Sequence, residues 1–268
     1  MKITTYLILG LSSLLFLSSC KSSDDTTCCD TPYVSGYYIQ GYFTDLKEDG
    51  IMFEPNWTLL SLDETNKIFE IDWNHLENQR GNALAMTLSF KAIHQAPTKG
   101  NSGGTPGYYN LFHVFSDSIG DNHYASSYFR SWTSEYPMAI GEKFESVKLF
   151  TDQDYAPEFK AGSDVSSLFT VYFEDMLRTV QNDYRSVTEE GTYQDKNFII
   201  NGDRNLFPHT ISAVKLADID FSKRQFTGTK WYVKPHQLPA ESGVYTFTIE
   251  IKKENGQTVR KQTPAFYL

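Results

Sequence analysis

Cysteine is scarce in this sequence and is confined to one end of it. Cys20, Cys28 and Cys29 are the three cysteines of the 268-residue chain, and none follows Cys29. The long cysteine-free remainder excludes a disulfide framework, so a hydrophobic core must hold the fold. Adjacent Cα atoms lie about 3.8 Å apart, closer than the ~4.4–6.8 Å typical of a disulfide, so we expect free or intermolecularly paired thiols at Cys28 and Cys29.

Clustered positive charge is also absent. The chain has 24 Lys and Arg against 33 Asp and Glu, a formal net charge of -9, and no Lys/Arg-rich run. Nucleic acid is bound through clustered cations, so we expect no nucleic-acid partner. The histidine nearest to the cysteine pair is His75, which is too remote to suggest a zinc site. We therefore expect neither a metal nor another cofactor.

The familiar catalytic motifs are missing. The sequence contains no Gly-x-Ser-x-Gly, no His-Glu-x-x-His and no Gly-Lys-Ser/Thr. The glycine-rich residues 99–107 include Pro106 and lead into residues 108–115. Residues 108–115 are apolar on both faces of an extended chain, which predicts a strand covered on both sides. Because a phosphate loop must open a helix, we interpret residues 99–107 as a surface loop. His123 has no second histidine at helix or strand spacing, so we read it as an ordinary surface or core side chain.

Several acidic groups resemble parts of known sites without completing one. Paired carboxylates can hydrolyse glycosides when their environments separate their pKa values, but alternating acids more often form a solvated face. The acids in question are Asp152, Asp154 and Glu158, and the pair Asp218 and Asp220. Asn201, Asp203 and Asn205 have the spacing of calcium ligands, yet Leu206 stands where the loop needs glycine. We expect no enzymatic activity from these residues.

The N-terminus has the pattern of a lipoprotein signal. Lys2 precedes an apolar run over residues 6–17, which is shorter than the ~20 residues that span a bilayer. Cys20 follows directly and is the predicted lipidation site, since a diacylglycerol on its thiol and an acyl chain on the new N-terminus give stable anchoring. Removal of residues 1–19 would change the formal charge from -9 to -10. Residues 20–32 are polar and read as a flexible tether, and residues 33–268 as a β-rich body with a subdivision near residue 140 left open.

Ser23, Asp24 and Asp25 follow this cysteine closely. A lipidation cysteine followed by such a Ser-Asp-Asp stretch resembles the surface-export signal of Bacteroidota lipoproteins. That resemblance implies an outer-membrane protein, anchored by its lipid and facing the cell exterior. The remaining chain is similar to uncharacterised β-rich lipoprotein families of that phylum, which implies no activity.

Alternating apolar residues dominate the body. Period-two patterns with β-branched and aromatic residues predict half-buried antiparallel strands at residues 69–73, 84–92 and 245–251. Asn255 and Gly256 tolerate positive φ and predict a hairpin, with a return strand over residues 257–267. We therefore expect a mainly β fold, an antiparallel immunoglobulin-like β-sandwich of one or two units with at most one substantial helix.

Residues 165–180 have two competing interpretations. Their apolar side chains recur at helical spacing, and Ser163 and Asp164 could cap the start of an amphipathic helix. A weak internal sequence repeat, called the echo below, argues against this helix. In it, residues 147–149 and 169–171 resemble residues 214–216 and 247–249. The last of these is a predicted strand. Two diverged sandwich units or coincidence would each explain the echo.

Aromatic residues are the remaining functional signal, with 19 Phe, 17 Tyr and 4 Trp. Rings that also carry a polar group suit stacking on sugars. The strongest candidates are one set of aromatic residues at four-residue spacing in a polar stretch. The pairs Trp231–Tyr232 and Tyr108–Tyr109 are weaker candidates. The function expected is a cell-surface lipoprotein with a binding or structural role, glycan being the first ligand to test. An adhesin or accessory subunit of an envelope complex is the alternative, and a glycoside hydrolase the third. The predicted ligand-binding residues are Tyr124, Tyr128, Trp132 and Tyr136.

Overall fold

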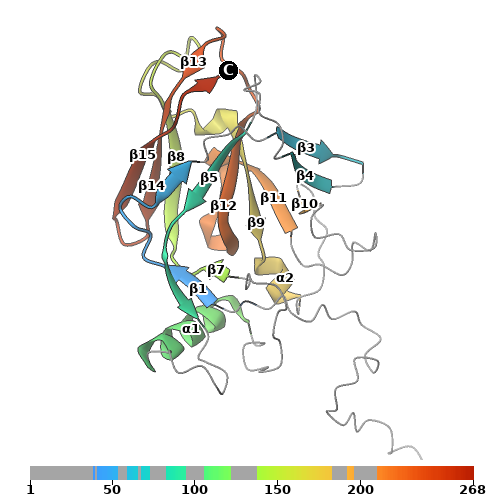
Figure 1. The fold of residues 1–268 in the computed structure, drawn as a ribbon, viewed down its shortest axis with the longest axis vertical. Coiled ribbons are helices and arrows are strands. Elements are labelled where there is room, and N and C mark those ends of the chain that lie inside the picture. The colour runs from blue at the N-terminus through green and yellow to red at the C-terminus, as the bar shows by residue number, and fades with distance from the viewer. Residues whose placement is uncertain are drawn as a thin grey trace, which may run out of the picture. The chain divides into compact units, whose positions relative to one another are not determined.

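The computed structural model describes residue 39 and residues 41–53, 59–65, 68–72, 83–94, 106–121, 138–182, 192–195 and 210–268. By its contacts the chain divides into Met1–Tyr33 and Val34–Leu268, and every described residue belongs to the second unit. Within these residues the protein is mainly β, with strands in three sheets (Figure 1).

The largest sheet contains eleven strands from the described part of the chain. Nine follow the order β3-β4-β10-β11-β9-β12-β7-β1-β6, while β5 pairs with β12 and with β2. Most pairs are antiparallel, and β1–β7 and β10–β4 are parallel. The strands are β1 (Gly41–Thr44), β2 (Ile51–Phe53), β3 (Leu59–Asp63), β4 (Ile68–Asp72), β5 (Leu84–Leu88), β6 (Lys91–His94), β7 (Met138–Ile140), β9 (Phe169–Asp175), β10 (Thr192–Asp195), β11 (Thr210–Lys215) and β12 (Phe226–Pro235).

A second sheet has the order β15-β14-β8, and a short ribbon pairs β13 with β16 near the C-terminus. These strands are β8 (Phe144–Thr151), β13 (Val244–Tyr245), β14 (Phe247–Lys253), β15 (Thr258–Gln262) and β16 (Phe266–Tyr267). Residues on one face of β14 are all buried and alternate with half-exposed ones, as the sequence predicts for residues 245–251. The hairpin between β14 and β15 is also confirmed, but the return strand predicted over residues 257–267 ends at Gln262, and Phe266–Tyr267 form the separate strand β16.

The two larger sheets pack face to face around the main core. Val147 and Ile249 from the small sheet join Met86, Val171 and Trp231 from the large sheet in one buried cluster. Burying such apolar faces stabilises the fold by about 25 cal/mol per Å² removed from water. The arrangement is therefore a two-layer, β-sandwich-like body.

The large sheet also curls over its own opposite face. Phe69 on β4 lies next to Tyr172 and Tyr232, with ring centroids 5.7 and 5.8 Å apart, although β10 and β11 separate β4 from β9 in the sheet. Consequently Val171 and Tyr172, on opposite faces of β9, are both buried. This strand order differs from the immunoglobulin arrangement, in which four strands oppose three.

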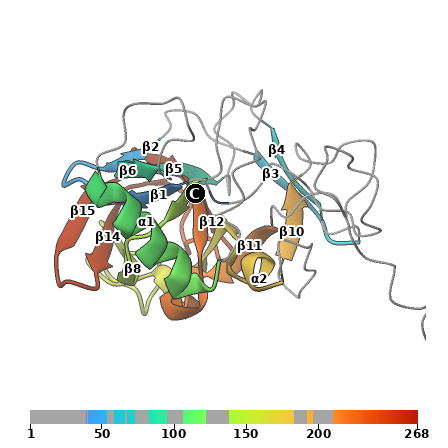
Figure 2. The same cartoon turned by 90° about the horizontal axis from the view of Figure 1, so that it is seen from below.

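Helix α1 (Pro106–Ile119) corrects the strand predicted at residues 108–115. Proline suits the first turn of a helix, where its missing N–H costs nothing. At the other end Gly120 has φ +74°, and the amides of Gly120 and Asp121 donate to the carbonyls of Asp117 and Ser116, a Schellman motif. Figure 2 shows α1 across the lower end of the strands, where it contacts β1, β6 and the short helix α2 (Leu177–Gln181).

The amphipathic helix predicted at residues 165–180 is also wrong for most of its length. The segment begins with the 3₁₀ turn η2 (Ser166–Leu168), continues as strand β9, and ends in α2. The competing echo correctly indicated a strand at residues 169–171. The first pair of similar segments lies in β8 and β9, and the second pair lies in and next to β11 and in β14. In the fold β8 pairs with β14 and β9 pairs with β11, so each strand of the first pair is hydrogen bonded to a strand of the second.

The predicted strand over residues 84–92 is two strands. β5 ends at Leu88 and β6 begins at Lys91, and between them Ser89 exchanges backbone hydrogen bonds with Gly50 and Lys47. This chain crossing is close, because a Cβ on Gly50 would lie 2.7 Å from the Ser89 carbonyl oxygen. The bend moves β6 from the neighbourhood of β12 to that of β1.

Candidate functional site

The principal residues predicted from the sequence lie outside the described part of the chain. These are the lipidation site Cys20 and the four aromatics Tyr124, Tyr128, Trp132 and Tyr136. His123 and the calcium-like residues 201–205 lie outside it as well. Among the weaker aromatic candidates, Trp231 and Tyr232 are buried in the core, so they offer no surface for stacking.

The acidic candidates are structural. Asp152 accepts hydrogen bonds from the amide and hydroxyl of Thr246, which ties β8 to the start of β14. Asp154 accepts from Lys160 and the Ala161 amide, and these bonds lower the pKa of Asp154. Both carboxylates are exposed and hold turns in place.

Asp220 has the same kind of role on the 3₁₀ turn η6 (Phe221–Lys223). It accepts from Lys223 and from the amide and hydroxyl of Ser222. The Lys223 hydrogen bond first, and the Ser222 hydroxyl second, lower the pKa of this exposed carboxyl to about 2. The turn is thereby fixed beside a pocket.

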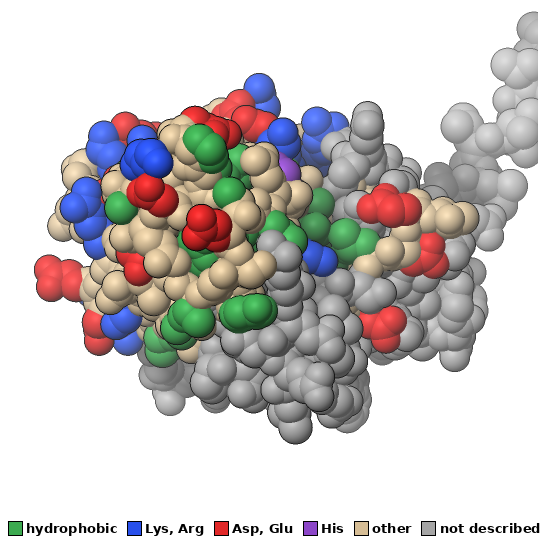
Figure 3. Space-filling view, turned by 90° about the horizontal axis from the view of Figure 1, so that it is seen from above, with side chains coloured by type: hydrophobic (Ala, Val, Ile, Leu, Met, Phe, Trp, Pro, Cys, Tyr) green, Lys and Arg blue, Asp and Glu red, His purple; other side chains and the backbone are tan. Residues whose placement is uncertain are grey.

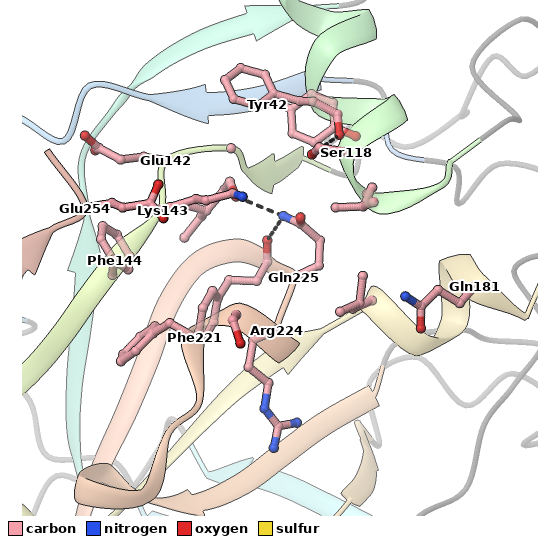
Figure 4. Close-up of a pocket in the computed structure, with 17 residues that line it drawn as sticks. Tyr42, Ser118, Glu142, Lys143, Phe144, Gln181, Phe221, Arg224, Gln225 and Glu254 are labelled. Atoms are coloured by element: carbon pink, nitrogen blue, oxygen red, sulfur yellow. Dashed lines mark hydrogen bonds between the residues drawn. The ribbon is translucent and has the colours of Figure 1, made fainter.

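This pocket lies where α1, the loop between β7 and β8, α2, η6 and the start of β12 meet (Figure 4). Its volume is about 280 Å³, at the lower end of ligand sites in proteins. The lining combines aromatic and aliphatic side chains with hydroxyl, amide and charged groups. The lining residues are Tyr42, Phe115, Ser118, Ile119, Ile140, Gly141, Glu142, Lys143, Phe144, Leu177, Gln181, Phe221, Ser222, Arg224, Gln225, Phe226 and Glu254.

Gln225 supplies the central polar group of this pocket. Its residue is 6% exposed, and its Nε2 donates to the carbonyl oxygens of Ile140 at 2.9 Å and Phe226 at 3.4 Å. Both amide protons are therefore directed at backbone acceptors, and this fixes the orientation of the side chain. The remaining atom, Oε1, accepts no hydrogen bond from the described residues. Because Gln225 lines the pocket, this oxygen can accept one from a ligand.

Asp175 holds the backbone around Gln225. Its side chain is 8% exposed and accepts hydrogen bonds from the Gln225 amide at 3.1 Å, the Leu177 amide at 3.2 Å and Arg224 at 2.7 Å. The Arg224 guanidinium also lies over the ring of Phe173, 5.9 Å from its centroid. In Figure 4 this guanidinium points away from Gln225. Asp175 therefore supports the pocket from outside it, and Arg224 lines the pocket while its guanidinium is held by Asp175.

Aromatic rings form the pocket walls. Phe115 from α1, Phe144 from β8 and Phe221 from η6 line it, and Phe115 and Phe221 are each only partly buried. Phe144 and Phe221 meet edge to face at 6.1 Å. A Cβ on Gly141 would lie 3.0 Å from the ring of Phe115, so the lack of a side chain at Gly141 makes room for this ring.

Behind this wall Tyr42 hydrogen bonds to Ser116 across 3.1 Å, and both residues are buried. Burial is the main reason that the pKa of Tyr42 is raised. The phenol is therefore neutral near neutral pH. It is a packing and positioning group with no role as an acid or base near neutral pH.

Charged groups lie at the rim. Glu142 pairs with Lys253 at 3.1 Å, and the two side chains are 12% and 7% exposed. Both also bind Leu46, since Glu142 accepts from its amide at 2.6 Å and Lys253 donates to its carbonyl at 2.9 Å. Lys143 and Glu254 are exposed and have no ion-pair partner among the described residues.

The described residues contain no group of His, Cys, Asp or Glu that could hold a metal ion. None of the helices described is long and apolar enough to cross a membrane. No protein-family model, curated protein or solved structure matches this chain.

Sequence reasoning missed this pocket. Its lining residues extend from Tyr42 to Glu254, and they share no spacing or motif that could have indicated a site. The signals that existed were weak ones. Gln225 is a polar residue directly before a strand that begins with an aromatic residue, and Asp220 and Ser222 form a local cap.

Proposed function

We propose that this protein is a lipid-anchored binding protein of the bacterial outer membrane, facing the cell exterior, and that the pocket around Gln225 accepts one residue of a glycan. Lipidation at Cys20 and export through Ser23, Asp24 and Asp25 account for the placement. The proposal includes no catalytic step.

The open acceptor on Gln225 between aromatic walls is the observation that carries the proposal. A sugar donates O–H groups and presents C–H faces, so one sugar can satisfy the amide oxygen and contact the rings at the same time. The hydroxyl of Ser118 donates to the Phe115 carbonyl, and that of Ser222 to Asp220. The oxygen atoms of both hydroxyls are therefore left as further acceptors for a ligand that is rich in donors.

The pocket volume limits the ligand to a small unit. A cavity of about 280 Å³ accommodates a single sugar residue and not a long segment of chain. The unpaired rim groups, Lys143 and Glu254, are of opposite charge, and Glu142 is neutralised by Lys253. The pocket therefore favours a neutral sugar.

The test uses the purified lipoprotein in detergent micelles and a panel of neutral oligosaccharides, with affinity measured by titration. Ser118→Trp would fill the pocket from α1, and we expect at least about tenfold weaker binding. Val114→Trp adds the same ring to the same helix on a residue that is 60% exposed and does not line the pocket, so binding should persist. An unchanged affinity in Ser118→Trp, or no binding to any neutral saccharide, would contradict the proposal.

A role as an adhesin or envelope-complex subunit is the second candidate. Val244 and Tyr267 lie directly opposite each other on the β13–β16 ribbon and are 61% and 43% exposed. Exposed apolar pairs of this kind occur at protein interfaces. Val244→Ser with Tyr267→Ser should abolish a protein partnership and leave saccharide binding unaffected.

A further inference from the structure

Two lysines lie in one row across the centre of the large sheet. Thr170 on β9 pairs with Lys215 on β11 on one side and with Lys234 on β12 on the other. Residues directly opposite in antiparallel strands project from the same face of a sheet. The side chains of Lys215, Thr170 and Lys234 therefore project together.

The spacing of this row suits an anion. Neighbouring strands are about 4.8 Å apart, so the Cα atoms of the two lysines are separated by about 10 Å. A lysine has a flexible four-carbon stem that carries a compact ammonium, and two of them can converge from either side on a group above Thr170. His236 directly follows the last residue of β12, and its Nδ1 lies 3.4 Å from the Thr170 hydroxyl.

These cations lack the partners that other lysines have. Elsewhere Lys148, Lys160 and Lys252 are paired with carboxylates. Lys215 and Lys234 form no ion pair with any described residue, and Asp218 on the 3₁₀ turn η5 (Leu216–Asp218) does not pair with Lys215. Lys47, Lys143 and Lys261 also lack an ion-pair partner among the described residues, so the feature that distinguishes Lys215 and Lys234 is their shared row.

The local electrostatics agree with this geometry. Burial lowers the pKa of Lys234. Burial first, and the charge of Lys215 second, lower the pKa of His236. Figure 3 looks onto this end of the strands and shows a histidine side chain with Lys or Arg side chains beside it. An anion placed here would relieve the repulsion that these groups exert on one another.

The row is also rigid. β9 is hydrogen bonded along both edges, to β11 and to β12. Beyond the end of β12, the amides of His236 and Gln237 donate to the Leu168 carbonyl at 3.0 and 3.3 Å. The backbone positions of Lys215, Lys234 and His236 are therefore set before any ligand arrives, which lowers the entropic cost of binding.

We propose that Lys215 and Lys234, with Thr170 between them and His236 beside them, bind an oxyanion of an acidic glycan, either a sulfate ester or a carboxylate. The choice of a glycan rests on the proposed function. Two lysines and one histidine are too few for nucleic acid, whose phosphates are bound through many basic contacts. The row and the pocket around Gln225 are separate sites, one for acidic groups and one for a neutral sugar.

The experiment uses the full lipoprotein in detergent micelles, with dextran sulfate and polygalacturonate as anionic probes and neutral dextran as their reference. The double variant Lys215→Gln/Lys234→Gln should bind the anionic probes about tenfold more weakly, since an exposed charge pair is worth about two- to fivefold per lysine. Inorganic sulfate should compete for the site, and binding should weaken as salt is added.

The matched control is Lys47→Gln/Lys261→Gln, which removes two exposed lysines that have no ion-pair partner among the described residues. Its affinity should equal that of the parent protein, with melting temperatures the same for all three proteins. Equal loss in both double variants, or no loss in Lys215→Gln/Lys234→Gln, overturns the site. Binding to phosphatidylglycerol vesicles but not to either polysaccharide overturns the glycan as its ligand.

The pocket is tested separately in the same assay. Ser118→Trp should leave binding of the anionic probes unchanged, because Ser118 does not belong to the row. If neutral saccharides fail to bind while the lysine-dependent binding persists, the pocket proposal is wrong and the row stands. The reverse result removes the row and leaves the pocket.

Discussion

At the scale of single residues, the buried ion pair between Lys253 and Glu142 is the interaction that stability should depend on most sharply. The pair is almost excluded from water, and the two side chains also bind both polar groups of the Leu46 backbone. Lys253→Met would leave the Glu142 carboxylate without its counter-ion. We expect a loss of about 3–5 kcal/mol in the free energy of unfolding, measured by chemical denaturation.

The neighbouring residue provides the control. Lys252 pairs with Glu145 at 2.7 Å, but these side chains are 39% and 52% exposed. Lys252→Met should therefore cost less than about 1 kcal/mol. The double variant Lys253→Met/Glu142→Leu should be more stable than Lys253→Met alone, because it contains no unpaired carboxylate. Equal effects of Lys252→Met and Lys253→Met would show that burial of the pair contributes nothing.

At the scale of elements, the β14–β15 hairpin differs in detail from its sequence prediction. Gly256 has φ +85°, while Asn255 is not in the left-handed region and accepts a hydrogen bond from the Gln257 amide through its side chain. The Gly256 amide donates to Lys253, and the Lys253 amide donates to Gln257. This is a turn followed by one left-handed glycine, and it needs only one residue with positive φ.

Gly256→Ala tests that conformation. A Cβ at this position would meet nothing within 4 Å, so the cost should come from the backbone alone. We expect about 1 kcal/mol of destabilisation by thermal or chemical unfolding, and a smaller loss for Gly256→Asn, which tolerates the left-handed region. If alanine and asparagine cost the same, the side chain's compatibility with positive φ is not what matters there.

Strands with one solvated face could be predicted from the sequence, whereas elements with other burial patterns could not. β14 alternates regularly between buried and half-exposed residues, so its period of two is visible. In β9 the consecutive apolar residues Val171, Tyr172 and Phe173 are buried on both faces, and such a run is indistinguishable by period from a buried helix. In α1 the exposed Leu111 and Val114 interrupt the helical spacing of the buried Phe112 and Ser116, which made the segment resemble a strand.

At the scale of the whole molecule, pairing between distant segments creates both candidate sites. β1 pairs with β7, β5 with β12, and β8 with β14, each across roughly a hundred residues or more of sequence. The pocket depends on such pairings because Tyr42, Gln225 and Glu254 share no local pattern. The lysine row depends on the pairing of β9 with β11 and with β12, which brings Lys215 and Lys234 to either side of Thr170. Composition could predict a β-rich body without indicating which surface of it binds.

The attachment of the protein to a membrane is the last prediction and concerns the whole chain. Cys20 lies just after an apolar run that is too short to span a bilayer, as in a lipoprotein signal. Cys20→Ser should therefore move the protein from the membrane fraction to the soluble fraction, or leave the signal uncleaved, as measured by fractionation and intact mass. Cys28→Ser/Cys29→Ser is the matched control and should remain in the membrane fraction. A cleaved Cys20→Ser protein that still sediments with membranes would contradict the anchor.

In the lipidated protein, replacement of Ser23, Asp24 and Asp25 by alanine should abolish cleavage by protease added to intact cells, because export to the outer face depends on that stretch. Unchanged cleavage would leave the lipid anchor intact and reject the export signal.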